Sequence, residues 1–164
     1  MSVNRKVTVP VGNSAIRLLQ RMLICTAAGE QGKSDVLVGG RLARRLNAGV
    51  TLLHVIPVGA RDINPTAKLH LERAAATLRG LDIHSQTSIR EAESPTEGIL
   101  SEAKEGGHDL IVVGVHGPSS RAIFRVEDVT YKVLSNSQLP VLVVPIEEES
   151  LNSRQRLRAR ARGR

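Results

Sequence analysis

Apolar residues in the middle of the chain follow two alternating patterns, short continuous runs and longer stretches with helical spacing. The continuous runs predict five strands, at Met22–Thr26, Val50–Ile56, Leu81–Arg90, Asp109–Val115 and Pro140–Ile146. Between the runs, helical spacing predicts four helices, at Ser34–Asn47, Pro65–Leu78, Pro95–Lys104 and Val126–Ser135. Strands that alternate with helices form a parallel sheet with right-handed crossovers, covered by helices on both faces.

Turn and capping residues predict where these elements end. Residues 94–97 (SPTE) place serine at the N-cap, proline at the first helical position and glutamate at the third, which is a capping box. Gly80 is the predicted C-cap of the preceding helix, and Gly106 with Gly107 ends the helix that follows the box. The segment Asn47–Gly49 closes the first helix. Turn and capping residues therefore mark the predicted ends of the first three helices.

The chain reads as one domain with two extensions. At 164 residues it has the length of a single domain, which we expect at 21–146. Residues 1–20 form an N-terminal extension, in which Val7–Val11 is either an extra edge strand or the remnant of a preceding repeat. Residues 147–164 form a charged tail of the kind that is usually disordered.

Hydropathy and cysteine content favour a cytoplasmic protein. The longest apolar run, Leu139–Ile146, is far shorter than the roughly 20 residues that span a bilayer. The first residues lack the apolar core of a secretory signal. Cys25 is the single cysteine, so no internal disulfide can form, and we expect a reducing compartment.

The formal net charge of +7 belongs to the tail. Residues 150–164 contain six arginines and no acid, whereas residues 1–149 carry 17 basic and 16 acidic side chains. The arginines predict either weak, salt-dependent attraction to nucleic acid or a solvated end that aids solubility. Phe124 and Tyr131 are the only aromatic residues apart from histidines. The chain therefore offers almost no aromatic side chains on which nucleic-acid bases could stack.

Two loops are the candidates for function. In an open parallel sheet, ligands bind beyond the carboxyl ends of the strands, at the point where the winding direction reverses. For this order of elements, the loops at that point are Thr26–Lys33 and Gly114–Arg125.

The first loop contains a near match to a phosphate-binding P-loop, residues 27–34 (AAGEQGKS). Its last three residues fit the motif, but Ala27 stands where a leading glycine is needed. The metal-orienting acid of such enzymes ends an apolar strand, whereas Asp109 begins one. A P-loop enzyme built on Lys33 and Ser34 therefore competes with a plain loop in which Ser34 caps the helix.

The second loop carries a more specific pattern. Residues 114–117 (GVHG) follow a buried strand and precede a loop, a helix and a closing strand, VLVVP. Together with RMLICT, VTLLHVIP, SPTEGIL and HDLIVVGVHG, in that order, this series resembles the universal stress protein family over about Arg21 to Ile146. Members of that family carry G-x2-G-x9-G-[ST] at this point.

The resemblance implies a fold, an assembly and a candidate ligand. The fold is α/β, a doubly wound five-stranded parallel sheet of order 3-2-1-4-5, like those of adenine nucleotide alpha hydrolases and Rossmann domains. The assembly is a homodimer through the C-terminal edge strand, and some members bind ATP while others do not. The positions that would contact a nucleotide are Thr26, Ala27, Val55, Gly114, His116, Gly117, Glu127 and Asp128.

The sequence departs from the family pattern at both ends of this site. Ala27 stands where nucleotide-binding members have an aspartate, which removes a hydrogen-bond acceptor. Glu127 and Asp128 stand in place of Gly-[ST], where two carboxylates would repel a triphosphate. One interpretation is that Asp128 caps the helix beginning at Val129 and fills the anion site. The other is that Glu127 and Asp128 hold a divalent metal that bridges to ATP.

These features lead to a ranked set of hypotheses. The first is a non-catalytic stress-response regulatory or interaction domain that has lost standard ATP binding, needs no cofactor and acts through protein partners that the sequence does not identify. The second is an ATP-binding member that uses magnesium, the third a P-loop enzyme and the fourth a nucleic-acid-associated protein. His54 is expected to be a satisfied core or edge histidine, and Cys25 a small apolar residue. His116 reads as an ordinary loop residue, and no metal-ligand spacing joins these three side chains.

Overall fold

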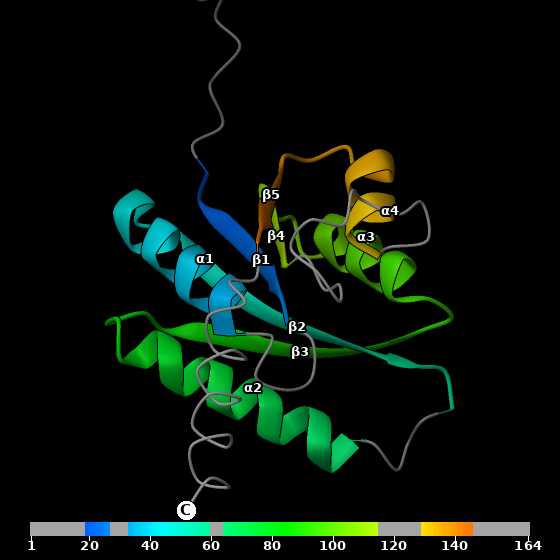
Figure 1. The fold of residues 1–164 in the computed structure, drawn as a ribbon, viewed down its shortest axis with the longest axis horizontal. Helices are drawn as coiled ribbons and strands as arrows, with labels where there is room; N and C mark the ends of the chain where they lie inside the picture. The colour runs from blue at the N-terminus through cyan, green and yellow to red at the C-terminus, as the bar shows by residue number, and fades with distance from the viewer. Residues whose placement is uncertain (1–18, 27–32, 60–63, 115–128, 146–164) are drawn as a thin grey trace, which may run out of the picture.

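Five parallel strands form one sheet in the order β3-β2-β1-β4-β5, with helices on both faces (Figure 1). The computed structural model describes residues 19–26, 33–59, 64–114 and 129–145. The strands are β1 Arg21–Cys25, β2 Gly49–Pro57, β3 Ser85–Ala92, β4 Leu110–Gly114 and β5 Val141–Val144. The helices are α1 Lys33–Leu46, α2 Asn64–Arg79, α3 Pro95–Glu105 and α4 Val129–Asn136. The predicted fold class and strand order are confirmed. None of these helices is long and apolar enough to span a membrane.

The central strands are buried on both faces. β1 pairs with β2 on one side and with β4 on the other, so that Ile24 lies between Leu52 and Val112. On the face covered by α1 and α2, Met22 and Ile24 join one core cluster. On the face covered by α3 and α4, Leu23 joins a second cluster. Burial on both faces explains why these strands are continuous apolar runs rather than alternating ones.

Glycines in the helices allow close approach to the sheet. A Cβ atom on Gly39 of α1 would lie 2.7 Å from Ile24 Cδ1. A Cβ atom on Gly98 of α3 would lie 2.6 Å and 2.9 Å from the two γ-carbons of Val55. Any larger residue at either position would push the helix away from the sheet or force a neighbouring side chain to move.

Three helices end in the same hydrogen-bonded motif. After α1, α2 and α3, the left-handed residue is Asn47, Asp82 or Gly107, with φ of 52°, 60° and 61°. In each case the next amide donates to the carbonyl five residues back, for example Ile83 N to Leu78 O at 3.0 Å, as in a Schellman motif. Gly80 directly follows Arg79, the last residue of α2, as predicted, whereas the left-handed residue that completes the motif is Asp82.

The same motif corrects the third strand. Leu81–Arg90 was the predicted strand, but β3 begins at Ser85, because the chain first completes the end of α2. Ile83 is buried in the core, but it belongs to the turn that ends α2 and not to a strand. Ser94 caps α3 as predicted, with its hydroxyl accepting from the Glu97 amide at 3.2 Å. Ser34 is the second residue of α1 rather than its N-cap.

The amino end of the sheet is held together by one carboxylate. Asp109 Oδ2 accepts hydrogen bonds from the amides of Gln20 at 3.1 Å and Arg21 at 3.0 Å. The Asp109 amide donates to the Arg21 carbonyl at 2.8 Å. These bonds fix the start of β1 against the start of β4. Asp109 consequently lies at the opposite end of the sheet from the candidate loops.

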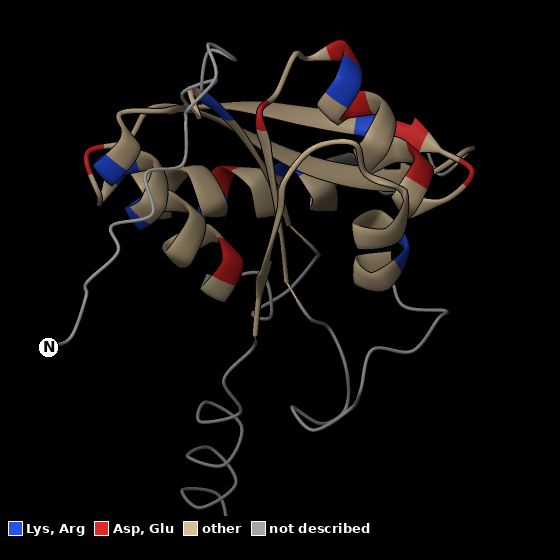
Figure 2. Cartoon of the chain, turned by 90° about the horizontal axis from the view of Figure 1, so that it is seen from above, with Lys and Arg blue, Asp and Glu red and all other residues tan. Residues whose placement is uncertain are grey.

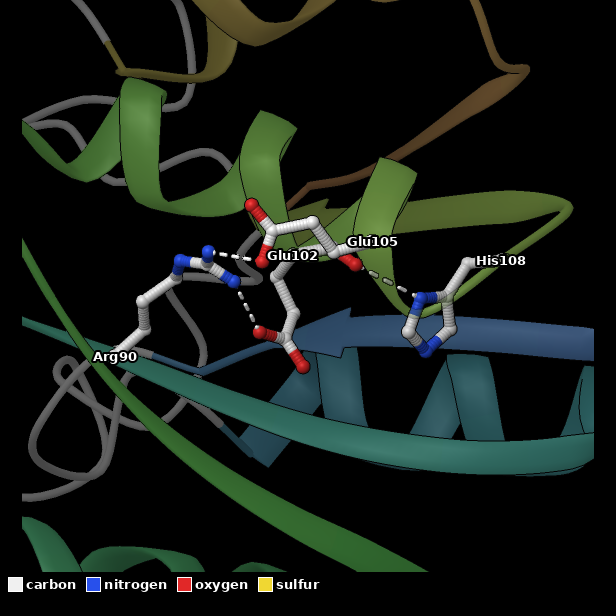
Figure 3. A network of polar contacts seen from close by, with 4 residues as sticks. All are labelled: Arg90, Glu102, Glu105 and His108. Atoms are coloured by element: carbon white, nitrogen blue, oxygen red, sulfur yellow. Dashed lines mark hydrogen bonds and ion pairs between the residues drawn. The ribbon is translucent and has the colours of Figure 1, made fainter.

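Most of the charged residues lie on the helices and connections rather than in the central strands (Figure 2). One network joins β3 to α3, where Arg90 lies between two glutamates (Figure 3). Its guanidinium donates to Glu102 Oε2 at 2.8 Å and also contacts Glu105. The ring of His108 is buried, with Nδ1 3.3 Å from the Glu102 carbonyl, while Nε2 has no partner in the described part of the chain.

Replacing Gly98 by alanine tests the close approach of α3 to β2. We expect Gly98→Ala to lower the free energy of unfolding by about 1–3 kcal/mol, because the new methyl group meets the stiff, β-branched Val55. Gly49→Ala is the control, since a Cβ there would lie 3.7 Å from the Gln20 carbonyl oxygen, which is an ordinary van der Waals contact. Urea unfolding followed by circular dichroism measures both. Equal stability of the two variants would contradict the close packing.

Candidate ligand site at the carboxyl end of the sheet

The winding direction of the sheet reverses between β1 and β4. β1 is followed by α1 and β2 on one side, whereas β4 is followed by α4 and β5 on the other. β1 and β4 are neighbours, and the helices that follow them, α1 and α4, cover opposite faces of the sheet. In open parallel sheets, ligands bind in a crevice beyond the strand ends at such a point, and that position is here called the crevice. The described residues there are Thr26, directly after β1, and Gly114, at the end of β4.

Thr26 extends β1 by one residue and fixes a histidine. Its amide donates to the Leu53 carbonyl at 2.9 Å, and its carbonyl oxygen lies 2.9 Å from His54 Nδ1. The carbonyl can only accept, so Nδ1 carries the proton. His54 is 9% exposed, and its ring centroid lies 6.4 Å from that of His70 on α2. The expectation of a satisfied core histidine at position 54 is confirmed.

Gly114 ends β4 under the first turn of α4. The Thr130 hydroxyl donates to the Gly114 carbonyl at 2.7 Å, and Thr130 is 3% exposed. This bond holds the beginning of α4 against the carboxyl end of β4. Glu127 and Asp128 directly precede Val129 in the sequence, but they lie outside the described residues.

Val55 and Cys25 face the opposite side of the sheet from His54. Both pack at the edge of the core cluster beneath α3 and α4, and Val55 also contacts Gly98. Burial raises the pKa of the Cys25 thiol, with smaller contributions from the carboxylates of Asp35 and Glu102. Cys25 is therefore protonated and unreactive at neutral pH, in agreement with its predicted apolar role.

Asp35 is the residue that sequence reasoning missed. It lies in the first turn of α1 and is only 1% exposed. Its Oδ1 accepts from the Val36 amide at 3.1 Å, whereas Oδ2 is buried and has no hydrogen-bond partner among the residues that the structure describes. Burial raises the pKa of this carboxyl to about 7, against the lowering effect of the Val36 and Asp35 amides. The available sequence signal was its spacing, because Asp35 stands four and eight residues before the buried Gly39 and Ala43.

The predicted site residues divide into two sets. Thr26, Val55 and Gly114 are described, and Thr26 and Gly114 come together at the crevice. Ala27, His116, Gly117, Glu127 and Asp128 lie outside the described residues, as does the loop before Lys33, so their roles stay predictions. Within the described ranges, no group of three or more histidine, cysteine or acidic side chains could hold a metal ion.

Carboxylates lie in the first turns of two helices. Asp35 in α1 has one carboxylate oxygen without a partner among the described residues, and Glu97 lies in the first turn of α3. Arginine or lysine occupies the last turns of α1, α2 and α3. α1 also begins at Lys33, whose side chain is not described. Asp109 lies at the amino end of the sheet, bonded to the backbone, so it does not act as the metal-orienting acid of a P-loop enzyme.

Comparisons with known proteins agree with this architecture. A family model described as the universal stress protein family matches residues 19–145. A universal stress protein from Archaeoglobus fulgidus is 18% identical, with a TM-score of 0.68 over 76% of this chain and 98% of that one. A universal stress protein from the same organism in complex with dAMP gives 0.65 at 18% identity, over 77% and 98%. A universal stress protein in complex with cAMP gives 0.64 at 22% identity, over 79% and 99%. No curated protein sequence matches the chain.

The buried carboxyl of Asp35 predicts a specific pH dependence of stability. An unfolded aspartate ionises above a pKa of 3.8, whereas Asp35 in the folded chain stays protonated up to about pH 7. Its contribution is therefore fully present below pH 3.8 and is lost as the pH rises to about 7. A shift of this size corresponds to roughly 4 kcal/mol.

We expect Asp35→Asn to remove this loss, because asparagine does not ionise. The measurement is the free energy of unfolding of both proteins in urea at several values between about pH 4 and pH 8. The difference between variant and wild type should grow in favour of the variant as the pH rises. Burial lowers the pKa of His108, which acts in the opposite direction, but this contribution is common to both proteins and cancels. If the stability of the two proteins changed with pH in the same way, the raised pKa of Asp35 would be refuted.

Proposed function

This chain belongs to the universal stress protein family, and we propose that it serves as a non-catalytic regulatory or interaction domain that has lost the standard mode of ATP binding. The observation that carries the proposal is the bond between the Thr130 hydroxyl and the Gly114 carbonyl at 2.7 Å. It holds the start of α4 at the crevice, and Glu127 and Asp128 directly precede that start in the sequence. Two carboxylates tethered there repel a triphosphate by about 1 kcal/mol per charge pair at 4 Å in water, and by more where water is excluded.

The absence of catalysis is part of the same proposal. Cys25, the single cysteine, is held in its unreactive thiol form by burial. His54 donates through Nδ1 to a backbone carbonyl and packs beside His70, which is a structural arrangement. Neither group is prepared as a nucleophile or as the base that would activate one. We assign the protein to the cytoplasm on the basis of its single cysteine.

A second candidate function is favoured by the ligands of two similar structures. Universal stress proteins of this fold have been solved in complex with dAMP and with cAMP. In this candidate, Thr26, Ala27, Val55, Gly114, His116 and Gly117 contact ATP, and a magnesium ion at Glu127 and Asp128 offsets the repulsion. The magnesium ion would supply positive charge between the phosphates and the carboxylates of Glu127 and Asp128.

Two further alternatives depend on parts of the chain that the structure does not describe. The P-loop alternative requires the side chain of Lys33, the first residue of α1, and the nucleic-acid alternative requires the arginines of the tail. The domain limits at 21 and 146 also stay predictions.

The edge strand β5 supports a homodimer. β5 pairs with β4 on one side, and within the described residues no strand pairs with its other side. Three of its four residues are half-buried, and Leu134 on the neighbouring α4 is 46% exposed. An apolar edge with unpaired backbone groups is stabilised when a second copy continues the sheet. We therefore infer that two chains pair along β5.

ATP binding is tested by thermal unfolding of the full chain with and without about 1 mM ATP, first in magnesium and then in EDTA. Under the leading proposal, ATP leaves the melting temperature unchanged in both buffers. A ligand at about 100 times its dissociation constant would stabilise by roughly 2.7 kcal/mol, or about 5–10 °C. A shift that disappears in EDTA would establish the magnesium-dependent alternative.

Matched variants sharpen this test. The double variant Glu127→Gly, Asp128→Ser should create or improve ATP binding under the leading proposal and abolish it under the magnesium-dependent one. Glu148→Gly with Glu149→Ser makes the same chemical change in the tail and should have no effect. ATP binding that Lys33→Ala alone abolishes would instead identify a P-loop enzyme.

The dimer is tested by light scattering after size exclusion. We expect a molar mass of twice the 17.7 kDa of the chain. Val143→Lys on β5 should give a monomer, because charged residues on an edge strand oppose pairing. Ile89→Lys on β3, at the opposite edge of the sheet, is the control and should remain dimeric. A wild-type monomer would overturn the inference.

A further inference from the structure

The strand β3 forms the longer of the two edges of the described sheet. It has eight residues, against four in β5 at the opposite edge. β3 pairs with β2 on one side, and within the described ranges no strand pairs with its other side. Such an edge presents a row of backbone N–H and C=O groups that a further strand can pair with, and proteins usually cover or charge it. The side chains around β3 indicate which strand would fit.

The two faces of β3 differ in chemistry. On one face, Arg90 lies against α3, where its guanidinium contacts both Glu102 and Glu105 (Figure 3). Two carboxylates share this one guanidinium, and the side chain of Glu105 stays 63% exposed. Ile89 lies on the other face, in register with His54, whose ring is beside α2, and Ile89 is 36% exposed. A strand added here would meet carboxylates on one face and an apolar side chain on the other.

Negative charge among the described residues is concentrated around this edge. Residues 82–105, which include β3 and α3, contain six acidic and two basic residues, a net charge of −4. The rest of the described residues contain three acidic and nine basic ones, a net charge of +6. Two β3 edges would therefore repel each other, which disfavours a second copy of the same edge as the partner. A basic strand would be attracted.

The tail of the chain has the sequence pattern of such a strand. Residues 154–164 (RQRLRARARGR) carry an arginine at every second position. In an extended strand, this period places all the arginines on one face and Leu157, Ala159 and Ala161 on the other. In a helix, the same spacing would place the arginines on opposite sides of the axis. An extended tail is thus two-faced in the same way as the edge of β3.

The tail is also long enough to reach this edge. The chain leaves β5 at the carboxyl end of the sheet, and the position beyond β3 is five strand spacings away, or about 24 Å. Residues 146–155 can span about 33 Å when extended. Residues 156–164 then remain to pair with β3, entering at its carboxyl end and running antiparallel to it. An antiparallel edge strand on an otherwise parallel sheet is common in α/β proteins.

We propose that residues 156–164 dock on the free edge of β3 of the same chain as an antiparallel strand, with their arginines on the face that bears Glu102 and Glu105. The docked tail and the acidic edge cover each other. The arginines are then withheld from other anions, and the edge is withheld from other basic strands. This contact does not depend on whether ATP binds, so it goes beyond the function proposed above.

The test is amide hydrogen exchange of the full chain, measured by mass spectrometry on peptides that cover β3. The first variant removes three arginines from the tail, Arg156→Ser, Arg158→Ser and Arg160→Ser. We expect β3 to exchange about tenfold faster in this variant, because the outward amides of β3 lose their partners, while the buried strand β1 is unchanged. The matched control removes three exposed arginines from α1, Arg41→Ser, Arg44→Ser and Arg45→Ser. It should leave exchange in β3 as in the wild type, and circular dichroism verifies that each variant is folded.

A second variant separates strand pairing from attraction by charge alone. It exchanges neighbouring residues of the tail, Leu157→Arg, Arg158→Leu, Ala161→Arg and Arg162→Ala. Composition and net charge stay the same, but the arginines now fall on both faces of an extended strand. We expect β3 to lose its protection in this variant as well.

Three outcomes would overturn the proposal. The first is exchange in β3 that is unchanged when the three tail arginines are removed. The second is full protection of β3 by the rearranged tail, since the attraction would then need no strand. The third is protection that disappears on dilution, since the tail would then dock on another molecule.

Discussion

Burial of the two central strands on both faces is the constraint on which the rest of the structure depends. Met22, Leu23 and Ile24 of β1 are fully buried, as are Ile111 and Val112 of β4. The middle of β1 and β4 therefore offers no polar side chain, so that on these two strands polar groups lie only near the ends. At the amino end, the Asp109 carboxylate accepts two backbone hydrogen bonds. In the first turn of α1, the buried Oδ2 of Asp35 has no hydrogen-bond partner among the described residues.

The order of elements could be predicted because it depends on local signals. Strands such as Asp109–Val115 are continuous apolar runs, and the capping box at Ser94 fixes the start of α3 within one residue. The errors occur where two signals compete. Leu81 and Ile83 alternate like residues of a strand, but the chain uses them to complete the end of α2, with Asp82 in the left-handed conformation. Periodicity alone does not distinguish these two uses of alternation.

The candidate site was only partly predictable for a different reason. Thr26 and Gly114 were found because the ends of neighbouring strands follow from the fold. Asp35 was not found, because its burial depends on how closely α1 approaches the sheet, and that approach is set by Gly39 and its contact with Ile24. A motif search assigns roles to residues that match a family pattern. It does not detect an acid such as Asp35, which becomes buried only through the packing of α1 on the sheet.

The described domain begins at the amino end of the sheet and finishes at its carboxyl end. Leu19 precedes β1 at the amino end of the sheet, beside the bonds of Asp109, whereas Pro145 follows β5 at the end that bears the crevice. A fusion partner, fluorophore or immobilisation tag joined before Leu19 would therefore start about a full strand length from the ligand site. The same group joined after Pro145 would start on the rim of that site, two strands from β1. The choice of attachment point thus determines whether a reporter senses the crevice or leaves it undisturbed.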